Sequence, residues 1–143
     1  TEGNVIHYGY IEKFIEGLGE RFNIREIAFD RWGAVQMVQN LEGMGFTIVP
    51  FGQGFKDMSP PTKELMKLTL EKRIAHGGHP VLRWMMDNIF IRTDPAGNIK
   101  ADKEKSTEKI DGAVATIMAL DRAIRCGNDN GASVYDTRGI LFI

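Results

Sequence analysis

Cysteine is almost absent from this 143-residue sequence, in which Cys126 is the one example. A single cysteine excludes an internal disulfide and a zinc site built from several cysteines, and it suits a reducing compartment. Long apolar runs are also missing, since none approaches the roughly 20 residues that a membrane-spanning helix needs. No signal-peptide pattern opens the chain. We therefore expect no membrane partner and a location in the cytoplasm.

The charge balance lacks any strong bias toward one sign. Eighteen basic and nineteen acidic residues give a formal net charge of −1. A role on nucleic acid would therefore need a local basic patch, with the acidic residues gathered elsewhere. Hydrophobic residues make up 43% of the chain, which suits one globular domain with a real core. The chain begins with Thr1 rather than Met, and we interpret it as a fragment.

Apolar spacing in the first third of the chain predicts an α/β arrangement. Residues 5–22 and 33–45 have helical spacing, whereas 25–30 and 46–51 are short apolar runs typical of strands. A strand, a helix and a strand over this length predict a βαβ unit with parallel strands.

The remaining pattern predicts three helices and a hairpin. A helix over 59–75 would take Ser59 as its N-cap, a second would span 81–90, and a hairpin would span 89–102 around a turn-forming cluster. The last helix would follow Ser106 as N-cap, with an apolar stripe through Ala113, Ile117, Leu120 and Ile124. We expect residues 1–126 to form the domain and residues 127–143 to be a flexible tail, because they are largely polar and glycine-rich.

Asp30 and Asp111 are the two acids that could carry chemistry. Asp30 ends a predicted strand, and sites in open α/β sheets form beyond the carboxyl ends of strands. It could equally be the N-cap of the next helix, a structural role that its spacing alone favours. Asp111 lies in the first turns of the last helix, where an acid stabilises the helix dipole. It could instead be a metal ligand beside the sheet.

Taken together, the two carboxylates suggest a metal site. Mg²⁺ and Mn²⁺ take oxygen ligands and leave positions open for phosphate oxygens. Two such ions about 3.5–4 Å apart can activate a water and stabilise the leaving oxygen of a phosphodiester. Two acids are few for two ions, so a third acid would be expected.

Four lysines, Lys100, Lys103, Lys105 and Lys109, precede Asp111. Such a run is usually a solvated face. The alternative is a strip of phosphate contacts beside the acids, which would bind DNA.

Three blocks of the sequence resemble a known family. They are FDRWGAVQMVQNLEGMGFTIVPFGQGFKDMSPPTKEL, HGGHPVLRWMMDNI and DPAGNIKADKEKSTEKIDGAVATIMALDRA. Their order and spacing are similar to the C-terminal nuclease domain of tailed-phage or prophage terminase large subunits, over roughly residues 5–125.

The resemblance implies an RNase H-like fold, a mixed sheet flanked by helices, and a metal-dependent endonuclease. Such a nuclease cuts concatemeric double-stranded DNA during genome packaging in the host cytoplasm, together with an ATPase domain, a small terminase subunit and the portal. The family's metal site is a small set of acids, which by resemblance includes Asp30 and Asp111 as catalytic ligands of Mg²⁺ or Mn²⁺. A further acid, on the first strand, has no counterpart here, so we expect this fragment to lack its first strands and to be weak or inactive alone.

Two other functions stay open at this stage. The chain could be a non-catalytic module that docks DNA or the portal, with its acids serving as helix caps. It could also be another RNase H-like nuclease, such as a resolvase, which would prefer branched DNA to linear duplex. Replacing Asp111 with Asn separates the first alternative from a nuclease, because a docking module would keep its binding.

Overall fold

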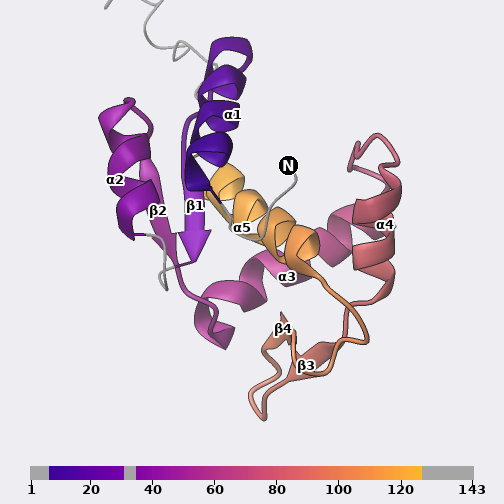
Figure 1. Cartoon of the computed structure of the whole chain (residues 1–143). Coiled ribbons are helices and arrows are strands. Elements are labelled where there is room, and N and C mark those ends of the chain that lie inside the picture. Colours follow the sequence, from indigo (N-terminus) through magenta and orange to yellow (C-terminus); the bar gives the residue numbers. More distant parts are fainter. Residues whose placement is uncertain (1–6, 31–34, 127–143) are drawn as a thin grey trace, which may run out of the picture.

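The computed structural model describes residues 7–30 and 35–126, so the expected tail over 127–143 lies outside the described residues. Figure 1 shows helices and short strands in one α/β arrangement. In chain order the elements are α1 (Tyr8–Arg21), β1 (Ile27–Asp30), α2 (Val35–Gly43), β2 (Ile48–Phe51), α3 (Phe55–Leu70), α4 (Pro80–Asp87), β3 (Ile91–Thr93), β4 (Ile99–Ala101) and α5 (Asp111–Cys126). None of the described helices is long and apolar enough to cross a membrane.

The predicted βαβ unit is confirmed. Strands β1 and β2 pair in parallel, with Ile27 opposite Ile48 and Asp30 opposite Phe51. Helix α5 packs against β1, and α2 packs against β2 (Figure 1). Because both strands run in the same direction, their carboxyl ends lie at the same end of the pair, and Asp30 is located there.

The predicted hairpin is also confirmed, as the antiparallel pair β3 and β4. Asp94 organises its turn: one carboxylate oxygen accepts hydrogen bonds from the backbone N–H groups of Ala96 (2.9 Å) and Asn98 (2.8 Å). The other oxygen accepts one from the Asn98 side chain at 2.8 Å. Gly97 has φ +77°, a left-handed conformation that glycine adopts without strain. The turn is therefore held by its own side chains.

Replacing Asp94 with Ala should destabilise the hairpin in a pH-dependent way. The Asn98 side-chain amide is the main cause that lowers the pKa of Asp94 below its usual value. A lowered pKa means that the carboxylate stabilises the fold above its unfolded pKa, near 4, and loses this effect as the pH falls through the folded pKa. Thermal melts should therefore show Asp94→Ala melting below the wild type at pH 7 and the two converging toward pH 2. A difference that persists unchanged at pH 2 would contradict this assignment.

Helix α3 begins one turn earlier than the sequence predicted, so the N-cap assignment of Ser59 is wrong. Gly54 precedes the helix, and Pro60 and Pro61 lie within it. Ser59 is buried, and its hydroxyl accepts a hydrogen bond from the backbone N–H of Ile99 at 3.1 Å. The preceding turn is helical because it buries Met58, which is 1% exposed. Tertiary packing has overruled the local capping signal.

Helix α5 begins later than predicted, and Ser106 is not its N-cap. The helix starts at Asp111, with the first backbone bond running from Val114 N–H to the carbonyl of Ile110. The Ser106 hydroxyl instead donates to the Asp102 carbonyl at 2.7 Å and accepts from the Phe90 N–H at 3.1 Å. Ser106 thus fixes the loop that follows the hairpin.

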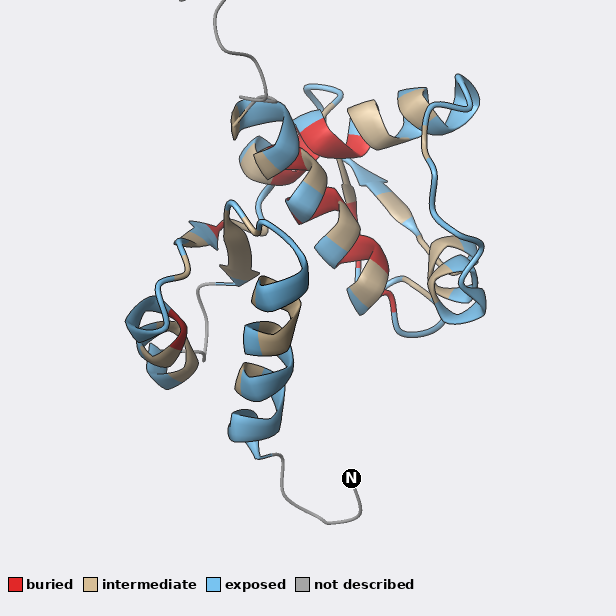
Figure 2. Ribbon diagram, turned by 90° about the horizontal axis from the view of Figure 1, so that it is seen from above, coloured by how far each residue is buried: buried red, intermediate tan, exposed pale blue. Residues whose placement is uncertain are grey.

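The core lies where α3 and α5 meet, as the buried segments in Figure 2 show. The α5 residues that face it include Ala113 and Ile117, as predicted. Leu120 is only half-buried and Ile124 is exposed, so the rest of the predicted stripe is wrong. The buried face also includes Val114 and Met118, each one position later in the chain than Ala113 and Ile117.

Candidate active site

Asp30 lines a cleft of about 220 Å³ at the carboxyl end of β1. We call it the Asp30 cleft, and its walls come from β1, the loop after β2, the hairpin and the turn that follows it. Its residues are Asp30, Gln53, Arg92, Lys100, Ala101, Asp102, Lys103 and Glu104. Two of the four predicted DNA-binding lysines therefore share a cleft with one of the two predicted acids.

Asp111 lines a second, smaller cleft of about 100 Å³ with Lys103, Lys109 and their neighbours. Its side chain is 63% exposed. The Lys103 ammonium donates to Asp111 Oδ1 at 2.7 Å. This hydrogen bond is the main cause that holds the pKa of Asp111 below its usual value, with smaller contributions from the charges of Lys103 and Lys109. Asp111 is therefore an ionised, solvent-facing carboxylate that already binds a cation.

Lys103 is common to the two clefts, because it lines both the Asp30 cleft and the cleft of Asp111. Its loop is held by Asp102, whose Oδ1 accepts hydrogen bonds from the backbone N–H groups of Glu104 (3.0 Å) and Lys105 (3.4 Å). The Asp102 carbonyl accepts another from Ser106 N–H at 3.0 Å. Lys103 thus extends from an ordered turn rather than from a loose surface loop.

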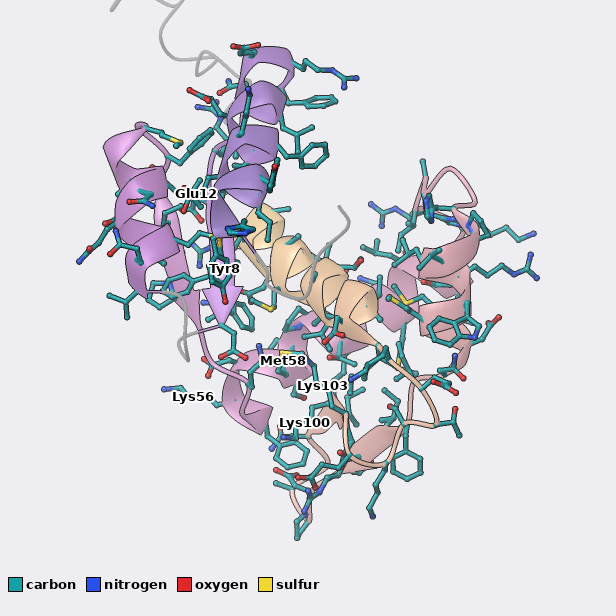
Figure 3. The ribbon with its side chains drawn as sticks, viewed as in Figure 1. Tyr8, Glu12, Lys56, Met58, Lys100 and Lys103 are labelled. Atoms are coloured by element: carbon teal, nitrogen blue, oxygen red, sulfur yellow. The ribbon has the colours of Figure 1, made fainter. Side chains whose placement is uncertain are left out.

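The remaining predicted lysines differ in their surroundings. The Lys100 ammonium donates to the Gln53 carbonyl at 3.3 Å and lies 5.3 Å from the centre of the Phe55 ring. Lys105 lies over the Phe90 ring, outside both clefts. Lys100 and Lys103 lie in the lower half of the view in Figure 3, together with Lys56. The lysine run is therefore divided between the two clefts and a solvated face.

Asp102 is the residue that sequence reasoning missed. It is a buried carboxylate at the end of the hairpin, and its Oδ2 lies 3.7 Å from the Arg92 guanidinium. Within the described residues, Asp102 Oδ2 is the one buried side-chain polar atom without a hydrogen-bond partner. The signal was present as an aspartate directly before the polar run KEKS, which is typical of a side-chain-capped turn. Arg92, on the same cleft, was missed as well.

The predicted acids carry the type of ligand atom that a divalent cation such as Mg²⁺ or Mn²⁺ binds. Both provide carboxylate oxygens, which are the ligand atoms of Mg²⁺ and Mn²⁺ in proteins. Asp111 already binds one cation, the Lys103 ammonium, at a position where a metal ion could bind. Over residues 7–30 and 35–126, however, no three acidic, histidine or cysteine side chains come together closely enough to hold a metal by themselves. Two carboxylates would leave most ligand positions to water, phosphate or a further acid.

A larger cavity lies elsewhere in the described part of the chain. It measures about 470 Å³ and lies between the start of β1 and the second half of α5. Its polar lining includes Glu26 and Arg122, which form an ion pair at 2.6 Å. None of the predicted site residues lines it. Asp30 lies at the opposite end of β1, in the Asp30 cleft.

Comparison with known families matches residues 1–126 to the model described as "Terminase large subunit, endonuclease domain". The chain belongs to this family. This result confirms the resemblance found in the sequence, and it extends over every described residue.

Two curated relatives agree with this assignment. The chain is 39% identical over 125 residues to "Terminase, large subunit" of Enterobacteria phage HK97, covering 86% of this chain and 25% of the relative. It is 32% identical over 126 residues to "Protein YmfN" of Escherichia coli strain K12, covering 87% of this chain and 28% of that protein. The chain therefore spans about a quarter of the length of the curated relatives it matches.

A solved structure agrees as well. The fold matches the crystal structure of the HK97 bacteriophage large terminase with a TM-score of 0.77, at 39% identity, over 86% of this chain and 26% of that one. The expected α/β fold is confirmed by this match, and the RNase H-like class is consistent with it. The chain is thus an endonuclease domain of the terminase large subunit family.

Proposed function

We propose that this domain is a metal-dependent endonuclease that cuts concatemeric double-stranded DNA during phage genome packaging. Membership in the endonuclease family supports the reaction class. The observation that carries the proposal is the Asp30 cleft, where a carboxylate at a strand end shares one cavity with Lys100 and Lys103. Carboxylates for a metal beside ammonium groups for phosphate are the two parts that phosphodiester hydrolysis needs.

Asp30 and Asp111 are the residues that would hold Mg²⁺ or Mn²⁺, as two ions in the complete domain. When bound, such ions activate a water and stabilise the leaving oxygen of a phosphodiester. Lys100 is anchored at its ammonium by the Gln53 carbonyl, so it can present positive charge to a DNA phosphate at the cleft. Such contacts orient the backbone without reading its bases. The cut would therefore depend little on local sequence.

The full protein would supply the other parts of the packaging machine. The chain spans about a quarter of its relatives, which leaves room for an ATPase domain and for an upstream strand with a further acid. We propose the portal and a small terminase subunit as its further partners, and the host cytoplasm as its location. The described part of β1 pairs with β2 alone, so its other edge could accept that upstream strand.

The test is cleavage by a chimaera in which this domain replaces the matching quarter of the HK97 large terminase. We expect nicking and cutting of linear duplex DNA that requires Mn²⁺ or Mg²⁺ and stops with a chelator. Preference for branched over linear DNA would favour the resolvase alternative. DNA or portal binding without any metal-dependent cleavage would favour a docking module and would contradict the proposal.

A further inference from the structure

Asp111, a predicted metal ligand, forms an ion pair with Lys103. The ammonium lies 2.7 Å from Oδ1, and both side chains are about half exposed or more, at 52% for Lys103 and 63% for Asp111. An exposed lysine usually samples many rotamers, so such pairs contribute little to stability. The contact is therefore better explained by what it does to the carboxylate than by its effect on the fold.

The position of Lys103 is set by the fold rather than by chance. Three hydrogen bonds to Asp102 order the backbone that follows it, from the N–H groups of Glu104, Lys105 and Ser106. Helix α5 fixes Asp111 at its first residue, and Ile110 directly before it is buried at 1% exposure. The backbone near Lys103 and the backbone at Asp111 are thus both fixed by other contacts. The ion pair can therefore form without the entropy cost of ordering a loop.

We propose that Lys103 is a built-in counter-cation that competes with the divalent ion for Asp111. This inference rests on the proposed metal site. An ammonium and a divalent cation at the same carboxylate repel each other, so the binding of one weakens the binding of the other. Lys103 therefore acts on metal binding as a positioning residue: its ammonium occupies Asp111 Oδ1, and it lowers the metal affinity of Asp111 until an ion displaces it.

The arrangement also explains why Lys103 lines both clefts. Lys103 contributes to the lining of both clefts, and its ammonium lies on Asp111. The other lysine of the Asp30 cleft, Lys100, is bound to the Gln53 carbonyl and the Phe55 ring instead of to a carboxylate. Of the two lysines of the Asp30 cleft, Lys103 is therefore the one that is bound to a predicted metal ligand.

The experiment is a titration of the 143-residue chain with Mn²⁺ by calorimetry at one pH and one salt concentration. Lys103→Met removes the charge and keeps the aliphatic stem, and it should bind Mn²⁺ about two- to fivefold more tightly than the wild type, in line with the strength of exposed pairs. A tighter metal site is not expected from a variant that merely damages the fold. Lys67→Met is the matched control, because it removes a lysine that is paired with Glu64 on α3, and it should leave the affinity unchanged.

Asp111→Asn separates the failure of this inference from the failure of the proposed function. In that background Lys103→Met should give no gain in affinity, because the shared carboxylate is gone. If Asp111→Asn weakens Mn²⁺ binding but Lys103→Met does not strengthen it, the competition is refuted and the metal site stands. If Asp111→Asn leaves Mn²⁺ binding unchanged, the metal site fails and the inference fails with it.

Discussion

Replacing Asp111 with Asn should lower metal-dependent DNA cleavage by the chimaera at least about 100-fold. Asparagine keeps the size of the side chain but loses the charge that a hard divalent cation requires. Losing one of few metal ligands removes several kcal/mol of transition-state stabilisation, and each 1.36 kcal/mol corresponds to a tenfold rate. The initial rate of plasmid nicking at saturating Mn²⁺ measures the effect, and Asp30→Asn should give a loss of the same order.

The fold should survive the Asp111→Asn change, which makes the result interpretable. Asp111 is 63% exposed, and the pair that it loses with Lys103 is a surface pair. Circular dichroism and thermal melts should therefore resemble those of the wild type. Glu64→Gln is the control, since it also removes one negative charge from an ion-paired surface acid, and it should cleave normally. Cleavage by Asp111→Asn at the wild-type rate would show that the acid is only a helix-terminal charge.

Replacing Ile117 with Ala should cost about 2–5 kcal/mol of the free energy of unfolding. Ile117 is 1% exposed and lies in the core cluster formed chiefly by α5, so the truncation removes buried methyl groups and leaves a cavity. The urea midpoint should fall accordingly, with little change in the slope of the transition. The expected loss is a large part of the stability of a domain of this size.

Ile124→Ala is the matched control for the core prediction. It is the same substitution two turns further along α5, at a side chain that is 54% exposed, and it should change stability by about 0.5 kcal/mol or less. The comparison tests the orientation of the helix directly, because the sequence pattern placed both residues on one stripe. Equal losses for Ile117→Ala and Ile124→Ala would mean that the original stripe was right and that the orientation of α5 described above is wrong.

The elements that the sequence predicted well are those whose signals are local. The βαβ unit follows from short apolar runs on either side of a helical period, and the hairpin follows from the turn residues around Asp94. The helix starts were wrong because Ser59 and Ser106 are good N-caps in isolation, yet both bind backbone groups of the hairpin region. Contacts of that kind join segments far apart in the chain, so they produce no periodic pattern in the sequence.

The candidate site was predictable in its residue types but not in its connections. Asp30 could be identified from its place at the end of a strand and Asp111 from its place in the first turns of the last helix, and the family resemblance implied that both are metal ligands. Nothing in the spacing indicated that Lys103 bridges their two clefts, because the bridge depends on the turn that Asp102 holds. Asp102 itself looked like the polar end of a hairpin, and only its burial identifies it as a structural centre of the site.

The most direct test of the central claim is a crystal of the chain soaked with Mn²⁺ and measured at a wavelength where manganese scatters anomalously. The account predicts an anomalous peak within about 2.5 Å of a carboxylate oxygen of Asp30 or Asp111, with the Lys103 ammonium displaced from Asp111 Oδ1. If instead Lys103 stays on Asp111 and no manganese binds at either acid, the two carboxylates are not metal ligands in this domain.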